Sequence, residues 1–324
     1  MRWLVRLLQT FGLVSGSGPP PWPERLDAQL DGLAPQGTVL RGYLDANSDA
    51  IARAITGRGP DSDKKTVGAG AHMAVNIAAV YVPAFCERSA NKERRPYLNC
   101  YDLEDRRIGD PPSVKRVHVD ESLPTAANMR RVVFGAVEVN GTGVRFYGDF
   151  CFILNDAMVR DETIVLDRNS YDIERQPLSA GITGASNAAR AAQRKSVVGT
   201  LVGEWSDLHA IVCIKLLDRF ARRQRRLTIG EISDAILADE DYVEILWLRP
   251  ADRVGSFGTA DLLEVRISAA DVALEERIGA HGATGPPPSS AEMAWRSQRR
   301  RAEEALNAEA VAVKVVTTTG RVRS

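Results

Sequence analysis

The 324-residue chain has few residues of the kinds that build metal sites or disulfide frameworks. It contains four cysteines and four histidines, and no two cysteines stand in a Cys-x-x-Cys pair. Metal-binding and redox cysteines usually stand at such short spacings, so we expect no bound metal. Cys151 and Cys213 lie in apolar runs, where a free thiol packs like a small hydrophobic side chain. Free thiols favour a reducing, cytoplasmic location.

Net charge and long apolar runs are also absent. Lys plus Arg and Asp plus Glu number 42 each, so no overall field attracts nucleic acid or an anionic membrane. Acidic residues follow both basic clusters, 221–226 and 296–305, which favours solvated helix ends over a nucleic-acid surface. The apolar stretch 1–14 is shorter than the roughly 20 residues that span a membrane. It is either a docking helix or a weak membrane-surface helix.

Common catalytic motifs are missing as well. The chain has no Gly-x-Ser-x-Gly nucleophile elbow, no Gly-rich phosphate loop ending in Lys-Ser or Lys-Thr, and no Gly-x-Gly-x-x-Gly turn. These absences argue against an α/β-hydrolase, a P-loop NTPase and a Rossmann dehydrogenase. An active site would therefore be built from polar residues on several separate elements.

Proline- and glycine-rich segments divide the chain. Two such clusters occupy 15–23 and 281–290, and chain breakers of this kind separate structural units. They predict three parts: an apolar helix with its linker over 1–23, a core domain over 24–280, and a linker with a charged helix and tail over 281–324. In the core, helical patterns come first, and a mainly antiparallel sheet, continuous or split, follows with inserted helices. The predicted fold class is α+β.

Apolar periodicity and capping residues predict the helices. Asn47 or Ser48 would cap the second of them, and Thr228 with Glu231 forms a capping-box pattern. The alanine-rich stretch before Pro83 reads as a buried helix. The predicted helices cover 24–33, 46–56, 71–85, the end of 177–204, 206–226, 228–237 and 291–310. The apolar middle of 206–226, "AIVCIKLL", could equally be a strand, because short apolar runs occur in both.

Alternating apolar residues predict the strands. Asn140-Gly141 stands between two β-rich runs, which is the strongest local signal for a hairpin. In the second run, 144–154, alternation places Val144, Phe146 and Phe150 on a core face and Arg145 and Tyr147 on the opposite face. Further strands are predicted at 163–166, 239–248 and 262–268.

A polar corner follows the strand at 163–166, in the segment "LDRNSYDI". It contains Arg168, Ser170 and Tyr171. With Asn169 and Asp172 as Asx-turn residues the corner would be a surface turn. Alternatively, it is the wall of a polar site at the strand exit, where binding residues are often held by a rigid scaffold.

Three residues occur in order along the predicted sheet: Arg145, Ser170 and Glu244. This set suits a dinucleotide, because a guanidinium neutralises phosphate, a hydroxyl can fix a ribose, and a carboxylate stabilises an oxocarbenium-like centre. Each residue also has a purely structural interpretation. Arg145 could pair with Asp149, Ser170 could form a turn, and Glu244 could face solvent.

In this order of residues the chain resembles the bacterial mono-ADP-ribosyltransferase toxins, over residues 130–270. "VRFYGDFCFIL" and "YVEI" are similar to parts of that family. The chain departs from the family in having "NSYD" in place of Ser-Thr-Ser, and Tyr242 where a Glu-x-Glu pair would begin. The resemblance implies a split antiparallel sheet that holds NAD as a substrate. It also implies catalytic roles for Arg145, Ser170 and Glu244, and NAD contacts from Arg145, Tyr147, Arg168, Ser170 and Tyr171.

The functional hypothesis from the sequence is an NAD-consuming, ADP-ribosyltransferase-like bacterial enzyme, a toxin or defence effector that acts on a protein target. The alternative is a non-enzymatic assembly protein. In that case the N-terminal helix and the helix over 291–308 would dock on an operon-encoded partner. Nucleic-acid binding through the arginine clusters is the least favoured hypothesis.

Overall fold

The structure is a computed structural model, and it describes the larger part of the chain. The described residues are 19–57, 70–93, 96–105, 111–155, 159, 163–171, 186–222, 226–236, 242–248, 257–280 and 287–317. The predicted N-terminal helix therefore lies almost wholly outside the described residues.

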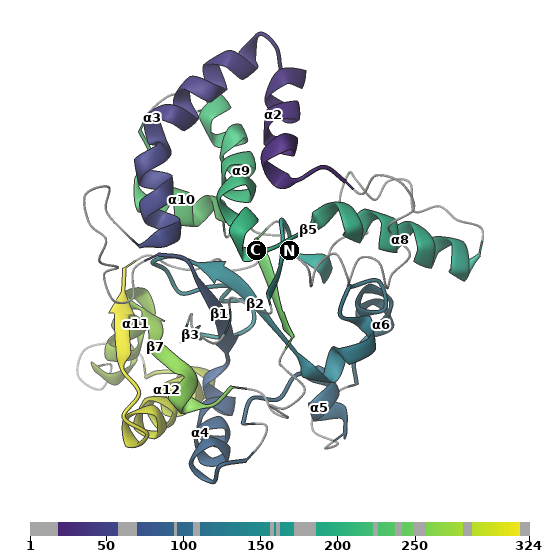
Figure 1. The fold of residues 1–324 in the computed structure, drawn as a ribbon. Coiled ribbons are helices and arrows are strands. Elements are labelled where there is room, and N and C mark those ends of the chain that lie inside the picture. Colours follow the sequence, from purple (N-terminus) through teal and green to yellow (C-terminus); the bar gives the residue numbers. More distant parts are fainter. Residues whose placement is uncertain are drawn as a thin grey trace.

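An eight-stranded sheet runs through the molecule (Figure 1), in the order β5-β4-β6-β2-β1-β3-β7-β8. Neighbouring strands are antiparallel except for β7 and β8, which are parallel. The predicted α+β class and the mainly antiparallel sheet are confirmed, and the sheet is continuous. Its strands are β1 (His72–Ile77), β2 (Val132–Glu138), β3 (Phe150–Leu154), β4 (Thr163–Leu166), β5 (Val202–Gly203), β6 (Glu244–Leu248), β7 (Leu262–Ser268) and β8 (Val313–Val316).

Helices cover both faces of the sheet. The main core lies on one face, where apolar residues of α2, α3, α4, α9, α10 and α12 pack on the strands. A second core lies on the other face, beneath α5, α6 and α8. The longer helices are α2 (Trp22–Gly32), α3 (Gln36–Thr56), α4 (Val82–Ala90), α5 (Cys100–Asp105), α6 (Val114–Asp120), α8 (Asn187–Leu201), α9 (Leu208–Arg222), α10 (Ile229–Ile236), α11 (Ala269–Ala280) and α12 (Ser290–Ala308).

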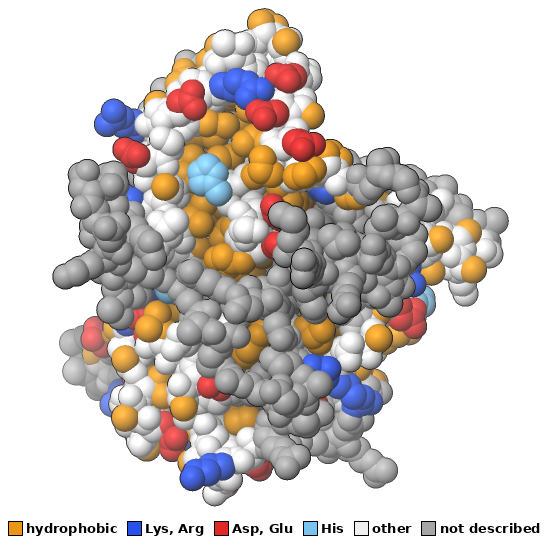
Figure 2. All heavy atoms as spheres, in the orientation of Figure 1, with side chains coloured by type: hydrophobic (Ala, Val, Ile, Leu, Met, Phe, Trp, Pro, Cys, Tyr) orange, Lys and Arg blue, Asp and Glu red, His pale blue; other side chains and the backbone are white. Residues whose placement is uncertain are grey.

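On the surface formed by the helices α2, α3 and α9, charged and apolar side chains occupy different regions (Figure 2). Figure 2 shows hydrophobic side chains gathered in the hollow between α2, α3 and α9, with Lys, Arg, Asp and Glu side chains around its outer rim. Short 3-10 turns connect several elements: η1 (Ala79–Tyr81), η2 (Ala126–Arg131), η6 (Trp205–Asp207) and η8 (Thr259–Asp261). Among the described residues, no helix has the length and apolar character needed to cross a membrane.

The predicted hairpin at Asn140-Gly141 is wrong. Strand β1 lies between β2 and β3 and pairs with both, so the chain must cross β1 to pass from β2 to β3. The predicted strand over 144–154 accordingly begins only at Phe150. Phe146, predicted in the core, belongs to the crossing segment and is 53% exposed.

The predicted helix over 71–85 is also wrong. Its first half is β1, a central strand buried on both faces, and such a strand reads as an unbroken apolar run. Pro83 lies in the first turn of α4 rather than at a helix end, because a helix tolerates proline where the N–H has no intrahelical partner.

Local capping signals had mixed outcomes. The Thr228–Glu231 capping box is confirmed, since the Glu231 N–H donates to Thr228 Oγ1 and the Thr228 N–H donates to Glu231 Oε2. Asn47, predicted as a cap, lies inside α3. Its Oδ1 instead accepts from the buried Leu227 N–H, a contact between distant segments.

The C-terminal segment predicted over 281–324 contributes to the core. Ala302 and Leu306 of α12 are fully buried in the main core, and β8 extends the sheet beside β7. In the structure α12 and β8 therefore complete the same α+β unit.

Candidate functional site

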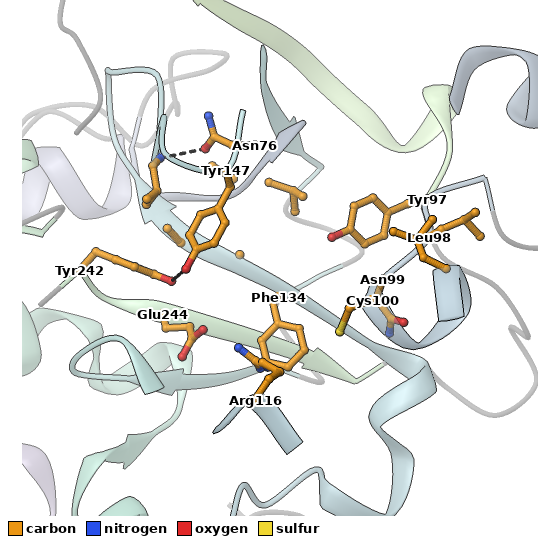
Figure 3. Close-up of a pocket in the computed structure, with 16 residues that line it drawn as sticks. Asn76, Tyr97, Leu98, Asn99, Cys100, Arg116, Phe134, Tyr147, Tyr242 and Glu244 are labelled. Carbon is orange, nitrogen blue, oxygen red and sulfur yellow. Dashed lines mark hydrogen bonds between the residues drawn. The ribbon is translucent and has the colours of Figure 1, made fainter. Parts of the chain in front are cut away.

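A pocket of about 340 Å³ opens on the sheet face opposite α9 and α10 (Figure 3). Its floor is a row of residues set by the strand register: Ala136 of β2 pairs with Ala74 of β1 on one side and with Glu244 of β6 on the other. Side chains of directly paired residues on neighbouring strands lie on the same face of the sheet. Because two of the three are alanines, the space beside the Glu244 carboxylate is open.

The segment that crosses β1 forms one wall of the pocket, and Glu138 fastens its start. The Glu138 side chain is fully buried, and its two oxygens accept from the N–H groups of Val139, Gly141 and Gly143 at 2.6–2.7 Å. A carboxylate that accepts several backbone N–H groups can bend a chain around itself and replace the ladder bonds that the segment lacks.

Asn76 of β1 fastens the middle of the same segment. Its Nδ2 donates to the carbonyls of Thr142 and Gly148, and its Oδ1 accepts from the Val144 N–H. All of these bonds lie within the protein, so the amide of Asn76 has a structural role although it lines the pocket.

Glu244 is the buried acid of the site. It is 2% exposed, and its Oε2 accepts from the Ser170 N–H at 2.8 Å. Burial raises the pKa of Glu244, although the nearby Arg116 guanidinium and the hydrogen bonding from Ser170 act in the opposite direction. Ser170 is held beside Glu244 because β4 and β6 pair, with Leu166 opposite Glu244.

Arg116, from α6, is the cation of the site. Its guanidinium lies 4.0 Å from the ring centroid of Phe134, and its Nε donates to Asp120 Oδ2 at 2.8 Å. Burial disfavours the charged form, but the charge and hydrogen bonding of Asp120, together with Glu244, raise the pKa of Arg116. Tyr101 donates to the same Asp120 oxygen at 2.7 Å and so fixes the acid.

Two tyrosines stand over the carboxylate. The hydroxyls of Tyr147 and Tyr242 are 3.4 Å apart, and the Tyr242 hydroxyl donates to Asn169 Oδ1 at 3.3 Å. Burial and the Glu244 charge raise the pKa of Tyr242 well above its usual value, which keeps its phenol protonated. Figure 3 shows both rings at the end of the pocket that contains Glu244.

The opposite end of the pocket is less polar. It is lined by Tyr97, Leu98, Leu103 and Cys100, which stand at or near the start of α5. Asn99 begins this helix: its Oδ1 accepts from the N–H groups of residues 101 and 102. Burial raises the pKa of the Cys100 thiol, so this cysteine is a weak nucleophile.

The structure brings together only part of the predicted site. Glu244 and Tyr147 line the pocket, and the predicted proximity of Ser170 to Glu244 is confirmed. Arg145 instead pairs with Asp271, Arg168 pairs with Asp167, and Tyr171 lies under the ammonium of Lys115. These three residues and Ser170 do not line the pocket, so the predicted convergence of all six side chains is wrong.

Sequence reasoning missed Arg116 and Tyr242. Tyr242 had a usable signal, because it precedes Glu244 by two residues and strand alternation places the two on one side. Arg116 had none, since it stands on a short helix far from Glu244 in the sequence. In the part of the chain that the structure describes, no group of three or more His, Cys, Asp or Glu residues could hold a metal ion.

Comparison of the chain with protein-family models, with curated proteins and with solved structures gave no match. The functional conclusion therefore rests on the geometry and chemistry of the pocket.

Proposed function

We propose that the pocket binds NAD and breaks the bond between its nicotinamide ring and ribose, with Glu244 as the catalytic carboxylate. The observation that carries the proposal is a buried glutamate beside two tyrosines in a pocket whose lining is largely aromatic and apolar. Paired with the resemblance in residue order, this favours an ADP-ribosyltransferase or an NAD glycohydrolase.

The charge of the pocket supports a cationic ligand. Glu244 and Arg116 line one end of the pocket, and Arg116 is already paired with Asp120. The three groups therefore have a net negative charge when all are ionised. Aromatic faces attract cations as well, and Tyr147 and Tyr242 stand beside the carboxylate. The nicotinamide ring of NAD is planar and carries a positive charge, which matches both features.

The same carboxylate suits the bond-breaking step. As the C–N bond breaks, its electron pair leaves with nicotinamide, which becomes neutral, and positive charge develops on the ribose ring. An ionised Glu244 beside that ring stabilises the charge, as carboxylates do in glycoside hydrolysis. Water then adds to the ribose carbon and releases a proton, which gives ADP-ribose; a nucleophile of a protein target would give the transferred product.

The roles of the other predicted residues change in this proposal. Ser170 positions Glu244 through its main-chain N–H. Arg145 is paired with Asp271, so the phosphate contact expected of it has no support in the structure. Arg116 is the cation that borders Glu244.

Incubation of the full chain with NAD labelled in the nicotinamide ring tests the proposal. We expect release of nicotinamide by the wild-type protein and its loss in Glu244→Gln, which keeps the shape of the side chain and an acceptor for Ser170. Glu121→Gln, at an exposed glutamate after α6, is the matched control and should keep wild-type turnover. Absence of turnover by the wild-type protein, or equal turnover by Glu244→Gln, would refute the assignment.

A bacterial toxin or defence role, a cytoplasmic location and a protein target remain hypotheses that depend on this activity. The assembly-protein alternative also remains a hypothesis. Its C-terminal docking helix would have to use the outer face of α12, because Ala302 and Leu306 already pack in the core.

A further inference from the structure

Two ion pairs from α11 and α12 hold the segment that carries Tyr147. Arg145 Nη2 donates to Asp271 Oδ1 at 2.5 Å, and Arg299 Nη1 donates to Asp149 Oδ2 at 2.7 Å. Arg299 Nη1 also lies 3.8 Å from Asp271 Oδ2, so the pairs form one group, called here the α11–α12 ion cluster. Arg299 is fully buried and Asp271 nearly so, which makes these contacts stronger than surface pairs.

Tyr147 stands between the two anchored positions, 145 and 149. Its side chain is 46% exposed and belongs to neither large core. Its hydroxyl lies 3.4 Å from that of Tyr242, and its ring contacts the ring of Phe146, which is itself exposed. The backbone on either side of the tyrosine is held by the side chains of Arg145 and Asp149, and Asn76 binds the carbonyl of the adjacent Gly148.

We propose that the α11–α12 ion cluster positions Tyr147 over the pocket and thereby sets the pocket's affinity for its ligand. Asp271 acts through Arg145, and Arg299 acts through Asp149, although neither lines the pocket. Arg145 is then a positioning residue and not a phosphate ligand. The choice of NAD as the ligand rests on the proposed function, whereas the positioning of Tyr147 does not.

The test compares three variants of the full chain: Asp271→Asn, Arg145→Gln and, as a control, Glu276→Gln. Glu276 also stands on α11, and its side chain is exposed. The first measurement is the Kd of NAD. The second needs no ligand: it is the rate at which N-ethylmaleimide alkylates Cys100, which lines the pocket and is the one cysteine that is not buried.

We expect Asp271→Asn and Arg145→Gln to raise the Kd of NAD by about tenfold each, because either change removes one partner of the Arg145–Asp271 ion pair. Both should also change the rate of Cys100 alkylation, because Tyr147 and Cys100 line the same pocket. Arg145→Lys keeps a cation for Asp271 and should restore most of the affinity. Glu276→Gln should match the wild type in both measurements.

Two results would overturn the proposal. If Arg145→Gln weakens NAD binding while Asp271→Asn leaves it unchanged or tighter, Arg145 contacts the ligand directly. If Glu276→Gln changes Cys100 alkylation as much as Asp271→Asn does, the cluster acts only on general stability. Absence of NAD binding by the wild-type protein would refute the proposed function alone, because the alkylation rates still decide whether the cluster positions Tyr147.

Discussion

Glu138 is the residue on which the crossing segment depends, and Glu138→Gln removes one of its two acceptor oxygens. In the wild type, Oε1 accepts from the N–H groups of Val139 and Gly141 and from the Ser233 hydroxyl, while Oε2 accepts only from the Gly143 N–H. Glutamine can keep the three Oε1 partners. Its amide nitrogen would then face the N–H of the buried Gly143, donor against donor.

The expected loss of unfolding free energy follows from that single contact. A hydrogen bond to a charged acceptor contributes about 1.5–3 kcal/mol, and a buried N–H left without a partner costs about 1–3 kcal/mol. Both figures describe the loss of the same hydrogen bond, so we expect Glu138→Gln to lower the free energy of unfolding by about 1.5–3 kcal/mol. Because Tyr147 stands on the same segment, the pocket should lose ligand affinity as well.

Urea denaturation measures the effect as a lower midpoint at an unchanged slope. Ser233→Ala is the matched control: it removes one 3.2 Å hydrogen bond to the same carboxylate and should cost only about 0.5–1.5 kcal/mol. A loss below about 1 kcal/mol for Glu138→Gln would show that the carboxylate does not hold the segment.

Three further predictions concern the pocket and the sheet. Burial raises the folded-state pKa of Glu244 above its unfolded value, so the stability of the wild type falls as pH rises through the folded pKa. Thermal melts between about pH 4 and pH 8 should therefore show the Tm of Glu244→Gln rising relative to that of the wild type as pH increases. A constant difference in Tm across this range would contradict the prediction. Ala136→Leu fills the pocket floor and should abolish NAD binding while the protein stays folded, as calorimetric titration and circular dichroism would show; undiminished binding would place the ligand elsewhere. Gly135→Ala should destabilise the protein by about 1–3 kcal/mol, because the new Cβ would lie 2.6 Å from the Ala74 carbonyl oxygen. Gly42→Ala, on the open surface of α3, should stabilise it by about 0.5–1 kcal/mol. Chemical denaturation should therefore show changes of opposite sign in the free energy of unfolding for the two variants.

Local sequence signals predicted structure correctly where the interacting residues lie within a few positions of each other in the sequence. The capping box at Thr228 and Glu231 is an example, because both of its hydrogen bonds close within four residues. The strands around 163–166 and 244–248 were also predicted, since alternation and β-branched residues identify a strand without reference to its neighbours.

Such local signals do not predict the order of the strands in the sheet. Asn140-Gly141 indicates a hairpin, and only the insertion of β1 between β2 and β3 prevents one. The bonds that hold the crossing segment come in part from Asn76, which lies 66 to 72 residues away in the sequence. No local pattern around residue 140 contains that information.

The candidate site divides in the same way. The sequence by itself determined that Glu244 lies in a strand and that Ser170 lies in the polar corner after the strand at 163–166. Their proximity depends on the pairing of β4 with β6, which only the tertiary structure shows. Only the tertiary structure decided the partners of the arginines. Arg145 is paired with Asp271, 126 residues later, and Arg116 reaches Glu244 from a helix on the other side of the pocket. A charged side chain is bound by whichever opposite charge the packed helices bring near it, and this depends on the assembled layers rather than on its own segment.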